Sequence, residues 1–296
     1  MIEIRVPAST ANLGPGFDAL GLALDLNNTY RFKEIEAGLE IYGVDEKYNN
    51  SDNLIYTSML TTFSKLGYSP KGLRIDVESE IPISSGLGSS AACIVAGVMG
   101  ANYLAGEPLS KEEIFSLATE IEGHPDNIAP AIFGGLIVSI MEDGKVYYNK
   151  MDIKEGIKFI VILPDFTVST REARKVLPDQ ISYQDGVFNV GRVALLLSAL
   201  SNGRFDLLRP ALNDRLHQPY RSKLIKGFDL VIDKCVELGS YGAYLSGAGP
   251  SIMAIADRDD EEFVEKMKEY LGGIGYNWHV KEMEINLTGA TMKKIP

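Results

Sequence analysis

The stretch from Pro82 to Ala92, with the sequence Pro-Ile-Ser-Ser-Gly-Leu-Gly-Ser-Ser-Ala-Ala, is well suited to bind an anion. It holds two glycines and four serines and runs into the apolar segment 91–105. Glycine lets a backbone approach a phosphate closely, and the free N–H groups at a helix start point toward such a ligand. We therefore interpret the stretch as a nucleotide-phosphate loop. The alternative interpretation is a tight strand-to-helix turn that only needs small residues.

The type of phosphate loop follows from what surrounds it. A Walker A motif, G-x-x-x-x-G-K-[ST], is absent, and residues 82–92 contain no basic residue. The string Gly86-Leu-Gly-Ser-Ser-Ala91 fits the dinucleotide pattern G-x-G-x-x-[GA], but no strand end with an acidic residue follows about 20 residues later. Without a lysine, the phosphate charge must be met by backbone N–H groups, hydroxyls and a metal ion. The sequence therefore predicts a nucleotide bound with Mg²⁺.

Three motifs together resemble those of the GHMP kinases, which include galacto-, homoserine, mevalonate and phosphomevalonate kinases. The loop P-x-S-S-G-L-G-S-S-A-A is similar to the ATP loop of that family. The segment from Val6 to Asp18, V-P-A-S-T-A-N-L-G-P-G-F-D, resembles its first motif, and the segment from Ser246 to Ser251, S-G-A-G-P-S, resembles its third. The resemblance implies an α+β, two-domain GHMP-kinase fold. It has an N-terminal ribosomal-protein-like α+β domain and a C-terminal ferredoxin-like α/β sandwich, with the active site between them.

Residues 122–130, E-G-H-P-D-N-I-A-P, resemble the homoserine kinase branch of the family. Residues 169–174, S-T-R-E-A-R, and the segment P-Y-R ending at Arg221 resemble the same branch. The resemblance implies ATP-dependent phosphorylation of the L-homoserine side-chain hydroxyl to O-phospho-L-homoserine, in threonine biosynthesis. Two arginines can grip a carboxylate in fork geometry while an acidic side chain binds the ammonium group. The predicted substrate-binding residues are Asn12, Asp18, His124, Arg174 and Arg221.

Other functions stay open at this point. Another GHMP kinase acting on a small alcohol, of the mevalonate or archaeal shikimate type, is the nearest alternative. A non-catalytic nucleotide-binding or dinucleotide-dependent protein is an alternative from another class.

The resemblance also implies the residues that bind the nucleotide and the metal. A loop serine and a helix glutamate hold Mg²⁺ in the family, and the motifs match them to Ser90 and Glu122, with Glu120 as the rival carboxylate. Hard cations of this kind prefer oxygen ligands. The predicted nucleotide-binding residues are Pro82, Ile83, Ser84, Ser85, Gly86, Leu87, Gly88, Ser89, Ser90, Ala91 and Ala92.

The catalytic base is left open by the sequence. Several relatives have an aspartate seven residues before a Gly-Gly pair, where this chain has Asn127, with Asp126 one position away. An amide cannot accept a proton at neutral pH, so Asn127 would only orient the attacking hydroxyl. If Asp126 turns into the site, a general-base route becomes available. Thr170 is expected to add a hydrogen bond near the transferred phosphate.

Composition bounds the class of protein. The chain of 296 residues is 45% apolar and 23% charged, which is ordinary for a globular protein with one large or two ordinary domains. A net charge of −11 argues against a nucleic-acid partner. The start of the chain lacks the apolar region of a signal peptide, no run is long enough to span a membrane, and the two cysteines form no C-x-x-C pair, so we expect a cytoplasmic protein. Family habit suggests a homodimer.

The elements that must position these residues follow from periodicity and end signals. The sequence predicts an N-terminal ATP-binding domain, residues 1–155, and a C-terminal ferredoxin-like domain, residues 156–296. Ser110-Lys-Glu-Glu113 is a capping-box pattern that begins a helix ending near Glu122. The other predicted helices are 54–66, the helix after the phosphate loop, 186–201, 222–238 and 261–271, and the predicted strands include 73–77, a hairpin around residues 143–144, 158–163, 243–245 and 252–256.

Overall fold

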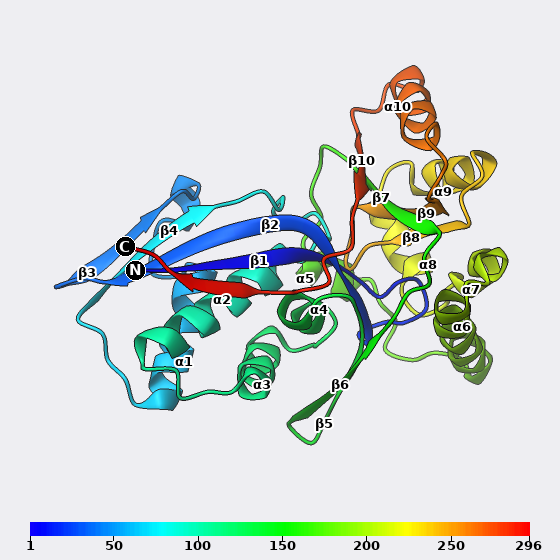
Figure 1. The fold of residues 1–296 in the computed structure, drawn as a ribbon. Helices are drawn as coiled ribbons and strands as arrows, with labels where there is room; N and C mark the ends of the chain where they lie inside the picture. Colours follow the sequence, from blue (N-terminus) through cyan, green and yellow to red (C-terminus); the bar gives the residue numbers. More distant parts are fainter.

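The computed structural model describes all 296 residues, and the chain forms two β-sheets with helices packed on them (Figure 1). The first sheet has seven strands in the order β11-β1-β2-β4-β3, with β5 pairing with β2 and with β6. Its strands are β1 (Ile2–Ala11), β2 (Leu20–Glu34), β3 (Gly38–Tyr42), β4 (Gly72–Glu78), β5 (Leu136–Glu142), β6 (Lys145–Met151) and β11 (Thr291–Lys294). The helices of this half are α1 (Leu54–Leu66), α2 (Ser89–Leu104), α3 (Lys111–Glu122) and α4 (Ile128–Phe133), with a 3₁₀ turn η1 (Glu46–Tyr48).

The second sheet has four antiparallel strands in the order β10-β7-β9-β8. In chain order this is the 4-1-3-2 arrangement of a split β-α-β, ferredoxin-like unit. Its strands are β7 (Ile157–Leu163), β8 (Gly242–Leu245), β9 (Ile252–Asp257) and β10 (His279–Met283). The helices of this half are α5 (Thr170–Lys175), α6 (Tyr183–Asn202), α7 (Leu208–Ala211), α8 (Gln218–Arg221), α9 (Phe228–Glu237) and α10 (Phe263–Gly273), with 3₁₀ turns η2 (Phe205–Leu207) and η3 (Ser222–Leu224).

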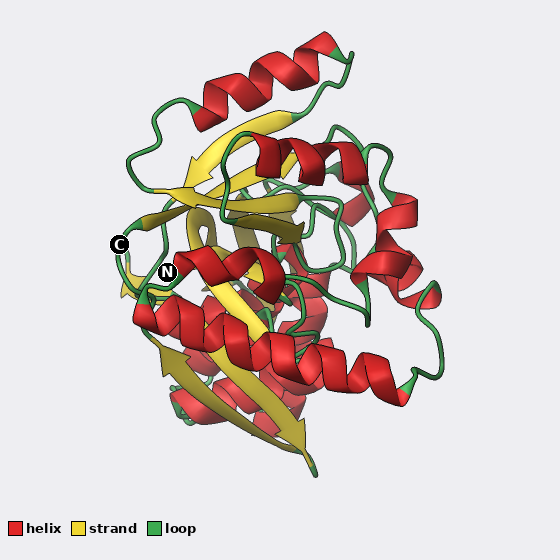
Figure 2. Ribbon diagram, turned by 90° about the vertical axis from the view of Figure 1, so that its right-hand side faces the viewer, coloured by secondary structure: helices red, strands yellow, loops and turns green.

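The larger of two hydrophobic clusters contains residues of both sheets. Along β7, Phe159 and Val161 belong to the large cluster that also fills the first half, whereas Ile160 and Ile162 face a smaller cluster with α9 and α10. Successive side chains of a strand point to opposite faces, so the apolar run 159–162 of β7 is buried on both sides. Helices α1 to α4 lie on one side of the first sheet (Figure 1), and the β5–β6 hairpin projects from the body (Figure 2).

Helix α2, which follows the phosphate loop, is the central helix of the first half. It carries no charged residue and is buried on most sides, as expected for a helix that is apolar all round. Gly97 lets α1 approach, because a Cβ there would lie 2.6 Å from the backbone oxygen of Ile55. The middle of α2 thereby packs closely against α1.

The capping box that starts α3 is confirmed. Ser110 accepts a hydrogen bond from the N–H group of Glu113, and the Glu113 carboxylate accepts one from the N–H group of Ser110. The helix ends at Gly123, which has φ = 91°. These two signals fix where Glu122 lies, at the last turn of α3.

Several elements differ from the sequence-based expectations. The prediction of a helix over 222–238 was wrong at its start. Helix α9 begins at Phe228, after Gly227 with φ = 85°, and residues 222–224 form η3 instead. The strands β10 and β11 and the helices α4 and α5 were not predicted from the sequence.

The chain leaves the first sheet after β6 and enters the second at β7, close to the proposed boundary at residue 155. It then returns, because β11 pairs with β1 from Ile2 opposite Lys294 to Arg5 opposite Thr291. The two termini lie side by side in Figure 1. The division into residues 1–155 and 156–296 therefore stays a proposal, with the last strand belonging to the first sheet.

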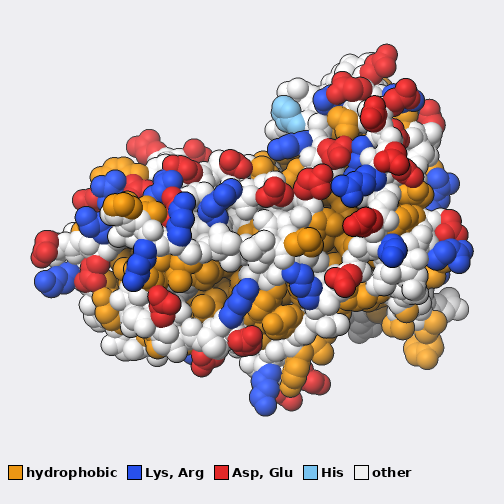
Figure 3. Space-filling model, viewed as in Figure 1, with side chains coloured by type: hydrophobic (Ala, Val, Ile, Leu, Met, Phe, Trp, Pro, Cys, Tyr) orange, Lys and Arg blue, Asp and Glu red, His pale blue; other side chains and the backbone are white.

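The surface carries both signs of charge. On the face seen in Figure 3, acidic and basic side chains are interspersed, and no large uniformly basic area gathers there. No helix of the protein has the length and apolar character that crossing a membrane requires.

Candidate active site

A cavity of about 330 Å³ is lined by residues from both halves of the chain. All three sequence motifs contribute to it, together with the turn between α3 and α4 and the start of α5. Arg174 and Arg221 are the only lysine or arginine side chains in its lining. Every predicted substrate-binding and catalytic residue lines this cavity: Asn12, Asp18, His124, Asp126, Asn127, Thr170, Arg174 and Arg221.

The phosphate loop turns sharply before α2. Ser84, Gly86 and Gly88 have φ values of 53°, 84° and 73°, in the left-handed region that favours glycine. Gly88 is the N-cap of α2, and no side chain caps the helix there. The first N–H groups of α2 are therefore available to a ligand, as expected for an anion-binding helix start.

The loop lies against the other two motifs. A Cβ on Gly88 would lie 2.2 Å from the Ser9 hydroxyl, and a Cβ on Gly86 would lie 2.4 Å from the backbone oxygen of Ser246. The Ser246 hydroxyl donates to the backbone oxygen of Gly86 at 2.7 Å. The N–H group of Ser9 donates to the backbone oxygen of Leu87 at 3.1 Å. The glycines are thus required by close approach as well as by conformation.

Not every residue predicted to bind nucleotide reaches the cavity. The lining includes Ile83, Ser84, Ser85, Gly86, Gly88, Ser89 and Ser90. Leu87, Ala91 and Ala92 are buried in the core instead and hold the loop in place, and Pro82 is not among the lining residues.

A hydroxyl and a carboxylate meet at the start of α2. The Ser90 hydroxyl donates to Glu122 Oε2 at 3.0 Å, and burial raises the pKa of Glu122. Glu120 points away toward Lys65 at 3.6 Å, with its side chain 72% exposed, and does not line the cavity. Ser90 and Glu122 thus offer adjacent oxygen donors beside the phosphate loop, the donor set that a hard divalent cation prefers.

The turn between α3 and α4 holds a hydrogen-bonded chain. His124 Nδ1 lies 2.7 Å from Asp126 Oδ1, and Asn127 Nδ2 donates to the same oxygen at 3.2 Å. The Ser9 hydroxyl donates to Asn127 Oδ1 at 2.9 Å. Burial lowers the pKa of His124, but the hydrogen bond to Asp126 and the charges of Asp126 and Glu122 outweigh it, so the pKa is raised overall.

Two arginines also line the cavity, close to this chain of contacts. Arg174 binds Asp18 in a bidentate ion pair, with N···O distances of 2.9 and 3.2 Å. The Arg221 side chain is buried and donates to the backbone oxygens of Ala173 and Gly247 at 3.1 and 3.0 Å. Burial and the charge of Arg174 lower the pKa of Arg221 to about 10, which leaves it a cation at neutral pH.

Asn12 and Thr170 complete the wall. Asn12 donates to the backbone oxygen of Gly247 at 2.9 Å and accepts from the N–H group of Asp18 at 3.0 Å. Thr170 is the first residue of α5 and is exposed on the cavity side. Asp18, His124 and Asp126 place ligand atoms within 4.8 Å of one another, but Asp18 is already paired with Arg174.

The far end of the cavity was missed by sequence reasoning. It lies between β2, β4 and the start of α1, where Asn53 caps α1 and donates to the backbone oxygen of Tyr48 at 2.9 Å. The Asn53 cap before an apolar helix was visible in the sequence, but nothing there marked it as part of a cavity. The additional lining residues are Asn28, Tyr30, Gly43, Val44, Asp45, Tyr48, Asn53, Leu54, Ile55, Val77, Ser79, Cys93, Val168, Gly247, Ala248 and Gly249.

Comparison with known proteins identifies the family. The GHMP kinases N terminal domain matches residues 53–135, and the GHMP kinases C terminal domain matches residues 196–272. A homoserine kinase of Clostridium beijerinckii is 53% identical over 293 residues, which cover 99% of this chain and 98% of that protein. The chain belongs to the GHMP kinases. The two-domain GHMP-kinase fold of mixed α+β content expected from the motifs is thereby confirmed.

Solved structures of GHMP kinases agree with this assignment. A crystal structure of homoserine kinase from Cytophaga hutchinsonii has a TM-score of 0.86 and 30% identity, covering 99% of this chain and 97% of that one. A structure of a putative homoserine kinase from Listeria monocytogenes has a TM-score of 0.81 and 30% identity, with full coverage of both chains. The mevalonate kinase of Methanococcus jannaschii, at 17% identity and a TM-score of 0.70, shares the fold.

Proposed function

We propose that this protein is a homoserine kinase, which transfers the γ-phosphoryl group of ATP to the side-chain hydroxyl of L-homoserine and yields O-phospho-L-homoserine on the route to threonine. One observation carries the proposal. A single cavity joins a lysine-free phosphate loop to a site where Arg174, Arg221 and Asp18 lie together. Full-length relatives at about 50% identity that are named homoserine kinases support the same function.

The nucleotide end of the site uses the backbone. The triphosphate lies across the loop 84–90, where the uncapped N–H groups at the start of α2 and the serine hydroxyls donate to its oxygens. The adenosine lies at the far end of the cavity, between η1, the start of α1 and Tyr30. The loop contributes no lysine or arginine to the cavity lining, so backbone groups and a cation neutralise the phosphate charge.

Ser90 and Glu122 are the residues that hold Mg²⁺. A cation held by these two residues would neutralise charge on the phosphate oxygens. The hydrogen bond between the Ser90 hydroxyl and Glu122 fixes both oxygens side by side at 3.0 Å before any ligand arrives. Glu120 has no part in this, because its carboxylate faces Lys65 on the surface.

The acceptor end binds a zwitterion. The carboxylate of the substrate lies against Arg174 and Arg221, and its ammonium group lies against Asp18, with Asn12 and His124 beside it. Guanidinium groups bind carboxylates in fork geometry, which makes an amino acid a better match than an uncharged alcohol. The side-chain hydroxyl then points toward Asn127 and Thr170 and to the phosphate loop.

Asn127 orients the attacking hydroxyl, and no side chain acts as the base. Asp126 Oδ1 accepts a hydrogen bond from Asn127 and lies 2.7 Å from His124 Nδ1, so this oxygen positions these two groups. The hydroxyl proton passes to the phosphate or to water, which suits a loose phosphoryl-transfer transition state. A general-base role for Asp126 is the alternative.

The remaining functional expectations belong to this proposal. A cytoplasmic enzyme that acts on small molecules, without nucleic-acid or membrane partners, fits a net charge of −11 and the mixed surface of Figure 3. Assembly as a homodimer is proposed as well. A kinase for mevalonate or shikimate is the alternative function, because the same fold serves other small alcohols.

The test is an ADP-release assay with Mg²⁺ and ATP over L-homoserine, mevalonate, shikimate, galactose and L-serine. We expect turnover with L-homoserine to exceed that with every other acceptor. Turnover confined to one of the other alcohols contradicts the substrate and leaves the kinase class standing. No ADP with any acceptor contradicts the kinase itself.

A further inference from the structure

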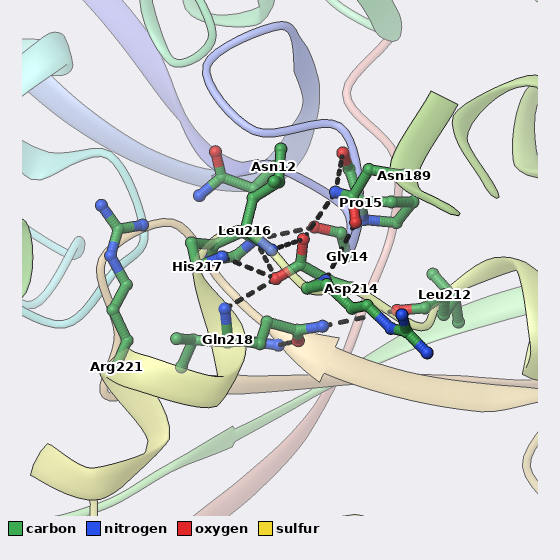
Figure 4. Close-up of polar contacts among 12 residues, drawn as sticks. Asn12, Gly14, Pro15, Asn189, Leu212, Asp214, Leu216, His217, Gln218 and Arg221 are labelled. Atoms are coloured by element: carbon green, nitrogen blue, oxygen red, sulfur yellow. Dashed lines mark hydrogen bonds and ion pairs between the residues drawn. The ribbon is translucent and has the colours of Figure 1, made fainter. Parts of the chain in front are cut away.

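Two side chains of the second half of the chain bind carbonyl groups of the loop 12–18 in the first half (Figure 4). His217 Nε2 lies 2.7 Å from the backbone oxygen of Gly14, and Asn189 Nδ2 donates to that of Pro15 at 3.1 Å. His217 is fully buried and its Nδ1 atom has no hydrogen-bond partner. The ring is therefore neutral with its proton on Nε2, since a second proton would leave a buried N–H group unpaired.

Asp214 holds both of these donors in place. Its carboxylate accepts hydrogen bonds from the Asn189 side chain at 2.7 Å and from the backbone N–H groups of Leu216, His217 and Gln218 at 2.9, 2.9 and 2.7 Å. The turn that precedes α8 is thus tied to α6 at one buried carboxylate (Figure 4). His217 and Asn189 have little freedom to move away from the loop.

The loop needs such support. Asn12, Leu13 and Gly14 follow one another with φ values of 69°, 42° and 77°, and Asp18 has φ = 56°. Residues other than glycine rarely adopt this region, and successive ones do so only where surrounding contacts hold them. A Cβ on Gly14 would lie 2.5 Å from the backbone oxygen of Leu212, so the loop also approaches the second half closely.

The same contacts connect both ends of the acceptor site. His217 starts α8, and its backbone oxygen accepts from the N–H group of Arg221 at 3.0 Å. The ring of Phe17 stacks on His217 with centroids 5.2 Å apart, and the guanidinium groups of Arg174 and Arg221 lie 5.7 and 5.0 Å from the Phe17 centroid. A shift of His217 therefore moves Asp18, through the loop, and both arginines, through Phe17.

We propose that His217 is a positioning residue for the acceptor amino acid. Through its hydrogen bond to Gly14 and its stacking on Phe17, it sets the distance between Asp18 and the two arginines. The inference rests on the proposed function. It makes His217 responsible for how well the acceptor amino acid binds, and not for the binding of ATP, because the phosphate loop lies elsewhere in the cavity.

The test compares three variants with the wild type in the homoserine assay, with KM measured for each substrate. His217→Leu removes the donor and keeps an apolar side chain of similar size, His217→Gln keeps an amide donor, and His279→Leu is the control at an exposed histidine of β10. We expect His217→Leu to raise KM for L-homoserine about tenfold with KM for ATP changed less than about twofold. His217→Gln should recover most of the loss, and His279→Leu should change neither constant.

The outcomes separate this inference from the proposed function. A wild type inactive on L-homoserine overturns the proposed function. An active wild type overturns the inference alone if His217→Leu leaves KM for L-homoserine unchanged or raises both KM values equally. If His217→Leu does not fold, Phe17→Leu at the partly exposed Phe17 replaces it: the same selective rise in KM for L-homoserine supports the inference, and no rise overturns it.

Discussion

Arg221 is a buried cation at the acceptor end of the cavity, and its charge is not neutralised by a partner of its own. It donates to two backbone oxygens while Arg174 takes the carboxylate of Asp18. Burial and the neighbouring guanidinium lower its pKa to about 10. An anionic group placed beside Arg221 relieves both of these unfavourable effects, which is the physical reason to expect a carboxylate there.

Replacing Arg221 by methionine keeps the length of the side chain and removes the charge. We expect KM for L-homoserine to rise about 30- to 100-fold, because charge-assisted hydrogen bonds to the carboxylate are lost, while KM for ATP changes little. Arg204→Met is the matched control, since Arg204 is 61% exposed and paired only with Asp206. Steady-state kinetics with each substrate varied decides the matter, and an equal rise in both KM values would show that Arg221 has a general structural role.

The assignment of the metal ligand rests on which glutamate faces the loop. Glu122→Gln keeps the side-chain shape and removes the carboxylate charge beside Ser90. We expect kcat to fall roughly 100-fold and the Mg²⁺ concentration for half-maximal activity to rise, because the cation loses a charged ligand. Glu120→Gln, two residues earlier on the same helix, should leave both quantities unchanged. Activity measured over a Mg²⁺ titration distinguishes them, and a loss confined to Glu120→Gln would reverse the assignment.

At this scale the sequence predicted residue types better than contacts. Asp18, Arg174 and Arg221 were all expected at the acceptor end, and they do lie together. The sequence could not predict that Asp18 and Arg174 pair with each other, because 156 residues separate them and their contact depends on how the two halves pack. His217 and Asn189 carried no signal at all, since their role lies in hydrogen bonds to backbone atoms of a distant loop.

At the scale of the elements, the turn into α2 is closely packed, and Gly88 is its tightest point. A Cβ at Gly88 would meet the Ser9 hydroxyl at 2.2 Å and Asn127 Oδ1 at 3.1 Å. Gly88→Ala should therefore displace the loop and lower kcat/KM for ATP about 100-fold, since small misplacements of a phosphate-binding loop are costly.

Gly106→Ala is the matched control for backbone conformation. Gly106 has φ = 92°, but a Cβ there would meet nothing within 4 Å. We expect this variant to lose about 1 kcal/mol of stability and to keep its activity. The two variants are compared by kinetics and by urea unfolding, and equal losses of activity would show that conformation, not close approach to Ser9, makes glycine necessary.

Elements with strong local signals were predicted closely. Helix α1 has the expected bounds of 54 and 66, and α3 begins directly after Ser110 of its capping box and ends at a glycine. The strands β10 and β11 were missed because each consists of only four or five residues without clear alternation and is stabilised by pairing with β7 and β1, far away in the sequence. Tertiary pairing decides such short strands, and local propensity does not.

For the molecule as a whole, β11 returns the end of the chain to the first sheet. Glu3 on β1 lies between β2 and β11 and binds a side chain of each. Its nearly buried carboxylate binds Arg31 of β2 at 2.7 Å and Lys293 of β11 at 2.8 Å. The hydrogen bond from Lys293 is the largest influence on Glu3 and outweighs burial, and with Arg31 it lowers the pKa of Glu3 below 4.5.

The pH dependence of stability follows from this shift. The folded state binds the Glu3 proton more weakly than the unfolded chain does, so this group makes the free energy of unfolding rise with pH. Its contribution is complete above the unfolded pKa of about 4.5 and is lost as pH falls through the lower folded value. Glu3→Gln should therefore lower the free energy of unfolding by about 1 kcal/mol at pH 7.

The gap between Glu3→Gln and the wild type should begin to narrow as pH falls below about 4.5, where the unfolded chain takes up the Glu3 proton, and should narrow further as pH falls through the lower pKa of the folded state. Glu78→Gln is the matched control, because Glu78 binds the same Arg31 but its side chain is 66% exposed, and it should show a smaller effect at every pH. Urea unfolding of the three proteins between pH 3.5 and 7 measures these differences, with the pH range set by the reference pKa of glutamate. A gap for Glu3→Gln that stays constant over this range would mean that the side chain acts through packing rather than charge, and that β11 is held by its backbone pairing with β1 alone.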